Sequence, residues 1–301
     1  MLYVQDFPTN SNPLAEKQAP NPTCSGSDFL VQLQRVLHSL TVPNNHAAFT
    51  LLHNYDFDYA AAHLVASWPV APVARGWAQM EQAGLARLGS VIRRFSLPYS
   101  RHMHLEAQGS SLAAYDRRWL EQFYLIAQGH DPVGLLPITP RQGDSASLEF
   151  SQATGLQGWP DMYILFPTQS WVEHQSIEGR MGGGCFFGRA SEFKKKNWHH
   201  LYAQPISHRG YMMMHAKTIL AQWDDPSVGW VYVGSHNFTR AAWGTISGSR
   251  DQPTQSISNW ELGIVLPLDS TNIEGESMDA IPYRQPVTPY SPSDTPWDVD
   301  S

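Results

Sequence analysis

The chain is poor in cysteine, in positive charge and in long apolar runs. Its 301 residues include two cysteines, Cys24 and Cys185, which are too few for a disulfide framework or for a zinc site built from thiolates. We expect two unrelated buried thiols in a reducing compartment. The formal net charge of −7 excludes a surface that is basic throughout, so any contact with nucleic acid must be confined to a local site.

No stretch of the sequence approaches the roughly 18 consecutive apolar residues that a membrane-spanning helix requires. The first residues also lack the basic segment followed by an apolar run that is typical of a secretory signal. Hydrophobic residues nevertheless make up 42% of the chain and aromatic residues 12%, which indicates a packed globular protein. The sequence therefore predicts a soluble intracellular protein of roughly one to two domains, with no membrane partner.

The spacing of apolar residues predicts an α/β domain. Helical spacing is found in three segments, residues 27–40, 76–95 and 116–128. Short apolar runs typical of buried strands lie at residues 60–70, 161–167, 229–235 and 258–268. Helices that alternate with such strands indicate a sheet covered by helices. Two segments rich in Pro, Gly, Ser and Asp are expected to be surface loops, residues 129–147 and 285–301.

Three polar residues of the stretch "YMMMHAKTILAQWDDPSVGWVYVGSHNFTRAAWG" indicate phosphate chemistry. His215 and Lys217 are two residues apart on an extended segment, so their side chains point to one face. Asn237 follows the next apolar run, and two neighbouring strands can bring all three residues to one cleft. An imidazole can act as nucleophile or acid/base near pH 7, while an ammonium and an amide can bind phosphate oxygens. The pattern favours phosphodiester chemistry without a metal or a cofactor.

The same stretch resembles the second half-motif of the phospholipase D superfamily, HxK followed by GSxN. It departs from the usual form at Gln222, where most members carry aspartate. This departure, together with "NFTRAAWG", resembles the tyrosyl-DNA phosphodiesterase family in particular. The resemblance implies a phospholipase D-like mixed sheet flanked by helices. In such a site His215 is the general acid/base, and Lys217 and Asn237 bind the phosphate.

Further segments are similar to the family in the same order along the chain. "SNWELGIVLP" resembles the strand whose glutamate, here Glu261, orients a catalytic histidine. "AQGSSLAAYDRRWLEQF" resembles the serine-rich loop that contacts DNA, which implies this role for Ser110 and Ser111, although Gly109 alters the start of the loop. Thr239 corresponds to a further contact with the DNA backbone. "MYILFPTQSWVEHQSIEGRMGGG", "KKKNW" and "IPYRQPVTPYSPSDTPW" extend the likeness to most of the chain.

Members of the family use two histidines, and only one is found here. Of the 13 histidines, only His215 is followed two residues later by lysine. The opening "MLYVQDFP" resembles a segment that lies after the first motif, so we expect the chain to begin past the nucleophile. Residues 1–75 would then be the remnant of the N-terminal domain, and residues 76–301 the complete C-terminal domain with the half-motif. Apolar surface exposed at the missing interface predicts poor solubility.

Three functions follow from the resemblance. The first is a DNA-repair phosphodiesterase of the nucleus that hydrolyses the 3′-phosphotyrosyl bond between DNA and a topoisomerase I peptide, or another 3′ adduct, with the nucleophile half truncated or supplied by another chain. The second is a non-catalytic protein that binds the 3′-phosphate of DNA ends. The third is a homodimeric nuclease in which two copies of His215 face each other, although the N-terminal remnant would crowd that two-fold axis.

Other notable residues have simpler interpretations. His102 and His104 form an HxH pair, which we interpret as a surface pair rather than a metal site because no acidic or cysteine cluster accompanies it in the sequence. His236 points away from Asn237 and is expected to pack internally. Lys194–Lys196 is the only basic run; a solvated helix face is expected, and a phosphate contact is the alternative.

Overall fold

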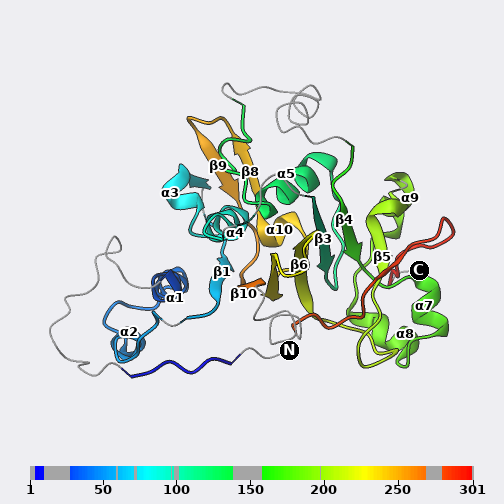
Figure 1. Ribbon diagram of the computed structural model, residues 1–301, viewed down its shortest axis with the longest axis horizontal. Helices are drawn as coiled ribbons and strands as arrows, with labels where there is room; N and C mark the ends of the chain where they lie inside the picture. The colour runs from blue at the N-terminus through cyan, green and yellow to red at the C-terminus, as the bar shows by residue number, and fades with distance from the viewer. Residues whose placement is uncertain are drawn as a thin grey trace.

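An eight-stranded mixed sheet runs through the centre of the molecule (Figure 1). The computed structural model describes residues 4–9, 28–58, 60–70, 73–95, 97, 102–137, 158–196, 198–268 and 280–299. In spatial order the strands are β1 (His63–Ser67), β10 (Glu261–Leu268), β7 (Gly229–Gly234), β6 (Lys217–Trp223), β3 (Met103–Gln108), β4 (Met162–Leu165), β5 (Tyr202–Gln204) and β11 (Thr288–Pro289). β3 is parallel to β4 and β4 to β5, whereas the other neighbours are antiparallel.

Both faces of the sheet are buried. Because successive side chains of a strand point to opposite faces, neighbouring residues of one strand belong to different cores. On β6, Ile219 belongs to the core on one face and Leu220 to the core on the other. The first face packs against α4 (Gly84–Ile92) and α5 (Arg117–Ala127). The second packs against side chains of the C-terminal segment, including Ile281 and Tyr283. A mixed sheet flanked by helices is the fold class that the sequence predicts, and it is confirmed.

A three-stranded antiparallel sheet lies beside the large one. It consists of β2 (Ala74–Arg75), β9 (Pro253–Ser256) and β8 (Thr245–Gly248). It contacts α3 (Trp77–Met80) and α4, and the short α10 (Arg240–Trp243) also contacts α4. These contacts tie the segment after β7, which contains the GSxN motif, to the helical layer.

The remaining helices flank the two edges of the large sheet (Figure 1). α1 (Asp28–Ser39) and α2 (Ala47–Leu52) lie on the β1 side; α7 (Gln169–His174), α8 (Gly179–Gly182), η1 (Gly183–Cys185), α9 (Ala190–Lys196) and η2 (His199–Leu201) lie on the β5 side. Asp28 anchors α1 by pairing with Arg87 at 2.6 Å, Arg94 at 2.7 Å and His63 at 3.0 Å. Burial opposes ionisation of this carboxyl, but hydrogen bonds from His63 and Arg87 hold its pKa well below the usual range.

The structure confirms most of the predicted elements and corrects two. The segment 76–95 holds two helices instead of one, because Gly84 adopts a positive φ of 56° and starts α4 anew. A Cβ at this position would lie 2.5 Å from the carbonyl oxygen of Trp243, so only glycine fits. The second correction is the C-terminal segment, which is not a loose surface loop: Trp297 is buried and donates a hydrogen bond to the carbonyl of Gly183 at 2.9 Å.

The predictions for the two cysteines and for the domain boundary compare differently with the structure. Cys185 is exposed, so its expected burial is wrong; Cys24 lies outside the described residues. The boundary at residue 75 stays a prediction, but β1 lies before it and pairs along its whole length with β10. Within the ranges described, no helix is long and apolar enough to cross a membrane.

Candidate active site

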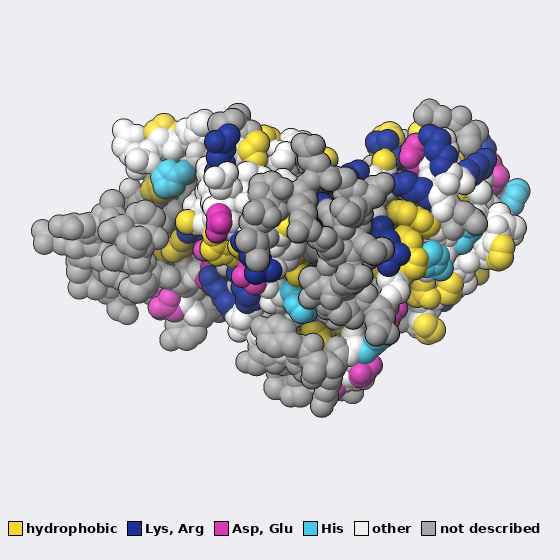
Figure 2. All heavy atoms as spheres, turned by 90° about the horizontal axis from the view of Figure 1, so that it is seen from above, with side chains coloured by type: hydrophobic (Ala, Val, Ile, Leu, Met, Phe, Trp, Pro, Cys, Tyr) yellow, Lys and Arg dark blue, Asp and Glu magenta, His cyan; other side chains and the backbone are white. Residues whose placement is uncertain are grey.

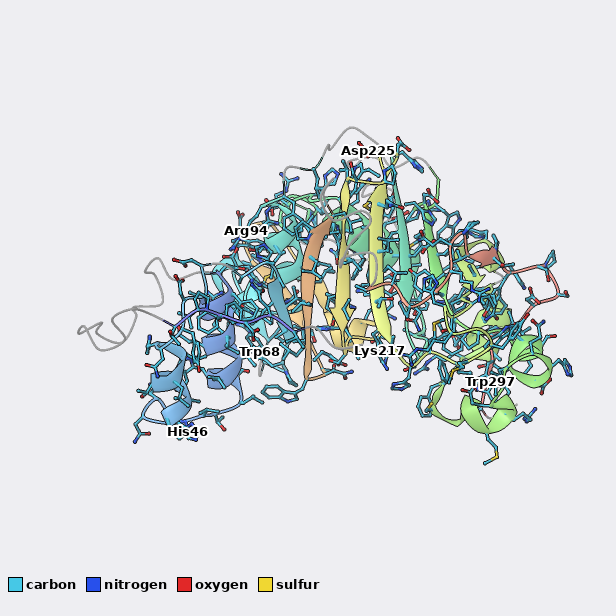
Figure 3. The ribbon with its side chains drawn as sticks, turned by 60° about the horizontal axis from the view of Figure 1, so that its bottom comes forward. His46, Trp68, Arg94, Lys217, Asp225 and Trp297 are labelled. Carbon is cyan, nitrogen blue, oxygen red and sulfur yellow. The ribbon has the colours of Figure 1, made fainter. Side chains whose placement is uncertain are left out.

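One end of the large sheet gathers the residues that the sequence analysis singled out. β3, β7 and β1 end there, at Gln108, Gly234 and Ser67, and β6 and β10 begin there, at Lys217 and Glu261. Lys217 lies opposite Gly234, and Ser67 lies opposite Glu261. Figure 3 shows Lys217 and Trp68 at this end of the sheet and Asp225 at the other. Antiparallel pairing therefore brings segments from across the chain to one edge.

His215 and Lys217 lie in direct contact, as their spacing predicts. Lys217 Nζ lies 2.9 Å from His215 Nδ1 and donates to the His215 carbonyl at 2.8 Å. Burial lowers the pKa of His215, and the charge of Lys217 lowers it further. Burial also lowers the pKa of Lys217, against the negative charge of Glu261, which raises it. The pair thus combines an exposed, readily deprotonated imidazole with a buried cation.

Asn237 is held by the serine-rich loop. Its Oδ1 accepts a hydrogen bond from the backbone N–H of Ser110 at 2.9 Å, and Ser110 Oγ lies 3.4 Å away. A Cβ at Gly109 would lie 3.0 Å from the same oxygen, so the altered start of the loop makes room for this approach. Because the contact uses the amide oxygen, the two amide hydrogens remain available for an anion.

Among the described residues, the side chain of Glu261 bonds Ser235 of the GSxN motif and the nearby Asn259, and no histidine. Ser235 Oγ donates to its Oε2 at 2.5 Å, and Asn259 Nδ2 donates to its Oε1 at 3.0 Å. Both carboxylate oxygens therefore accept hydrogen bonds at the start of β10. Here Glu261 fixes Ser235 and supplies negative charge near Lys217.

Ser111 and Thr239 flank the same end of the sheet. Ser111 forms an isolated bridge with Phe187, beside α9. Thr239 is the N-cap of α10, and its Oγ1 accepts from the N–H of Ala242 at 3.2 Å. A hydroxyl that accepts in this way can still donate its own hydrogen to a phosphate. The structure thus brings all seven predicted site residues to one end of the sheet.

His236 packs internally, as expected, but it also makes two side-chain hydrogen bonds. Its ring is stacked on Trp243 at 4.3 Å, contacts Tyr232 OH and lies 2.9 Å from Ser67 Oγ. Ser67 did not emerge from the sequence, because its partner lies 169 residues away and no local pattern links them.

The HxH pair has an acidic partner that the sequence did not reveal. Asp161 lies 2.9 Å from His104 and 3.2 Å from His102, and both histidine side chains are partly exposed, in line with the predicted surface pair. Burial disfavours the charged form of His104, but hydrogen bonds with Asp161 and Glu106 outweigh it and raise its pKa to about 9. In the described part of the chain, no group of three or more His, Cys, Asp or Glu residues could hold a metal ion.

The basic run forms the C-terminal half of α9, where Figure 2 shows Lys and Arg side chains gathered. Lys194 and Lys195 are exposed, and Lys195 pairs with Glu192 at 2.8 Å, as expected for a solvated face. Lys196 differs, because it donates to the carbonyl of Tyr115 and lies 4.8 Å from the centre of the Trp198 ring. It fastens α9 to the loop that follows Ser111.

Comparisons with known proteins agree with the motif. The family model described as tyrosyl-DNA phosphodiesterase matches residues 4–291. Tyrosyl-DNA phosphodiesterase 1 of Drosophila melanogaster is 28% identical over 239 residues, which are 72% of this chain and 37% of that protein. The protein of the same name from Arabidopsis thaliana is 24% identical over 357 residues, which cover 99% of this chain and 53% of that protein.

The fold agrees as well. The crystal structure of yeast tyrosyl-DNA phosphodiesterase matches with a TM-score of 0.62 and 17% identity, over 91% of this chain and 66% of that one. The chain thus spans about half or less of the length of the two curated relatives. Since the family model matches almost the whole chain, the chain belongs to the tyrosyl-DNA phosphodiesterase family.

Proposed function

We propose that this chain binds a DNA 3′ end through its phosphate and supplies the acid/base half of a phosphodiester hydrolysis. The observation that supports this most directly is the meeting of His215, Lys217 and Asn237 at one end of the sheet. Lys217 and the amide hydrogens of Asn237 bind the non-bridging phosphate oxygens and stabilise the charge that develops on them. By family resemblance, Ser111 and Thr239 contact the DNA backbone; the side chain of Ser110, for which the same role was expected, is buried, and Ser110 acts through its hydrogen bond to Asn237.

In the full reaction, a nucleophilic histidine attacks phosphorus and the bond to the tyrosyl oxygen breaks. His215, protonated at this stage, gives its proton to that oxygen and so releases the phenol. The bound phosphate favours this protonation because its negative charge stabilises the imidazolium. His215 then takes a proton from water, whose oxygen displaces the first histidine and leaves a DNA 3′-phosphate.

The first histidine is supplied, in this proposal, by a second HxK motif outside the 301 residues or on another chain. The substrate is DNA in the nucleus that carries a 3′-tyrosyl peptide of topoisomerase I, or another 3′-phospho adduct. A second candidate is binding of the 3′-phosphate without hydrolysis. It requires only the phosphate contacts of Lys217 and Asn237, which lie at one end of the sheet, and no second imidazole.

The test uses a short oligonucleotide with a 3′-phosphotyrosyl group and a matched one with a 3′-hydroxyl. We expect the chain to prefer the phosphorylated end and Lys217→Ala to reduce that preference about tenfold, or about 1.4 kcal/mol. His215→Ala should leave binding largely intact. Unchanged preference in Lys217→Ala would refute the assignment of the pocket.

Turnover separates the candidates. For the two-motif phosphodiesterase, activity should appear only when a chain with the other HxK motif is added, and His215→Ala should then abolish it. Binding without turnover under both conditions favours the second candidate. Turnover by the chain alone that His215→Ala abolishes, with a dimer in solution, favours the homodimeric nuclease.

A further inference from the structure

Three consecutive residues of the GSxN motif are each fixed to a different part of the large sheet. Ser235 donates to Glu261 and accepts from the N–H of Leu262 at 3.0 Å, both on β10. Asn237 is held by Ser110 after β3. His236 lies between them and contacts Ser67, the last residue of β1. The position of Asn237 therefore depends on how its neighbour His236 is held.

His236 has a hydrogen-bond partner on each ring nitrogen. Tyr232 OH accepts from the backbone N–H of His236 at 3.2 Å, so its own hydrogen is free for His236 Nδ1, which it contacts. The proton of the neutral ring then lies on Nε2 and is donated to Ser67 Oγ at 2.9 Å. Burial lowers the pKa of His236 to about 3, which keeps the ring neutral near pH 7.

Close packing leaves this ring little freedom to turn. It is stacked on Trp243, and the hydroxyl of Tyr232 lies against two glycines: a Cβ would approach it to 2.0 Å at Gly234 and 2.3 Å at Gly263. All of Ser67, Tyr232, His236 and Trp243 are at most 1% exposed. The ring is therefore locked by both hydrogen bonds and contacts.

We infer that His236 is a positioning residue, which uses Ser67 of β1 and Tyr232 of β7 to aim the amide of Asn237 at the bound phosphate. This inference rests on the proposed function, because it assigns Asn237 a phosphate to hold. It gives β1 an indirect part in the site, through the contact of Ser67 with His236. It also gives His236, at the x position of the GSxN motif, a role that a small apolar residue could not fill, because such a residue could not bond Tyr232 or Ser67.

The test compares the affinities of the full chain for an oligonucleotide with a 3′-phosphate and for the same oligonucleotide with a 3′-hydroxyl. We expect His236→Ala and Ser67→Ala to reduce the preference for the phosphate at least about fivefold, because small errors in the position of a binding group are costly. His236→Gln retains one donor and one acceptor and should recover part of the loss. Binding of the 3′-hydroxyl oligonucleotide should stay unchanged in all three variants.

Val65→Ala is the matched control, since Val65 is also buried on β1 but its side chain carries no polar group. It should lower the melting temperature and keep the preference. If Val65→Ala lost the preference for the 3′-phosphate equally, His236 would have only a general structural role. A ¹⁵N spectrum of the wild-type histidines gives an independent readout: a buried ring protonated on Nδ1 would contradict the inference.

The outcomes separate this inference from the proposed function. If the wild-type chain does not distinguish the two oligonucleotides, the proposed phosphate site fails and this inference fails with it. If the wild type distinguishes them and His236→Ala and Ser67→Ala do so equally well, the phosphate site stands and only the positioning role is refuted.

Discussion

The side-chain oxygen of Asn237 accepts a hydrogen bond from the backbone N–H of Ser110, a residue 127 positions earlier. The two halves of the proposed phosphate site are thereby joined directly: the loop expected to contact DNA holds the amide expected to bind phosphate. A substitution in the loop should therefore change the affinity for phosphate, even when no residue that binds the phosphate is replaced.

Gly109→Ala tests this coupling. The added Cβ would lie 3.0 Å from Asn237 Oδ1, so Asn237 must shift by a few tenths of an ångström. We expect several-fold weaker binding of a 3′-phosphorylated oligonucleotide, measured by fluorescence anisotropy, with a nearly unchanged melting temperature. Gly184→Ala is the control, because its Cβ would meet no atom within 4 Å. Equal affinities of the two variants would contradict the coupling.

The buried ring of His236 should make the protein less stable in acid. In the unfolded chain this histidine takes up a proton near pH 6.5, whereas in the folded protein its pKa is about 3. Between these values the unfolded state binds more protons, so stability falls as the pH falls, by up to about 1.4 kcal/mol per pH unit. Urea unfolding of wild type and His236→Gln between about pH 7 and about pH 4 should give a shallower slope for the variant. Equal slopes in the two proteins would refute the prediction.

The pair of His104 and Asp161 should have the opposite dependence. The pKa of His104 is raised to about 9, so its stabilisation is fully present below the unfolded pKa of 6.5 and is lost as the pH rises through 9. Because both side chains are about a third or more exposed, we expect no more than about 1 kcal/mol. Asp161→Asn should remove this loss between neutral and alkaline pH in urea unfolding. A wild-type stability that does not change over this range would refute the prediction.

Replacement of Asp28 should lower the free energy of unfolding markedly, because this carboxylate pairs with a buried arginine. Asp28→Ala leaves Arg87, whose side chain is 1% exposed, without its carboxylate, and we expect a loss of about 3 kcal/mol in the free energy of unfolding. Arg94→Ala removes a partner that is 46% exposed and should cost less than about 1 kcal/mol. Similar losses in both variants would show that the burial of Arg87 does not set the cost.

Local sequence patterns predicted the elements but not the contacts between them. Helical spacing located α1 and α5, and apolar runs located β1, β4, β7 and β10, because these signals depend on neighbours a few residues away. The break between α3 and α4 at Gly84 was not predicted, since the close approach of Trp243 to this glycine comes from a distant segment. The burial of Trp297 was not predicted for the same reason, because a segment rich in Pro and Ser gives no local sign of its contact with the distant Gly183.

The candidate site divides in the same way. The alternation of strand residues predicted that His215 and Lys217 share a face, and the next apolar run pointed to Asn237. Family resemblance added Ser110, Ser111, Thr239 and Glu261. The link from Ser67 to His236 and the link from Asp161 to His104 join residues 169 and 57 positions apart. Such contacts are determined by the pairing of whole strands, which a single sequence does not reveal.

The pairing of β1 with β10 also affects when the protein can act. The last strand to be synthesised at the binding end, which begins at Glu261, lies between β1 and β7. A growing chain therefore lacks the strand that joins β1 to β7 until residues 261–268 have been made. Contacts this distant in sequence form late and slowly. If the site binds a DNA 3′ end as proposed, chains that stop before β10 would lack the contacts of Ser235 with Glu261 and Leu262 that hold the motif.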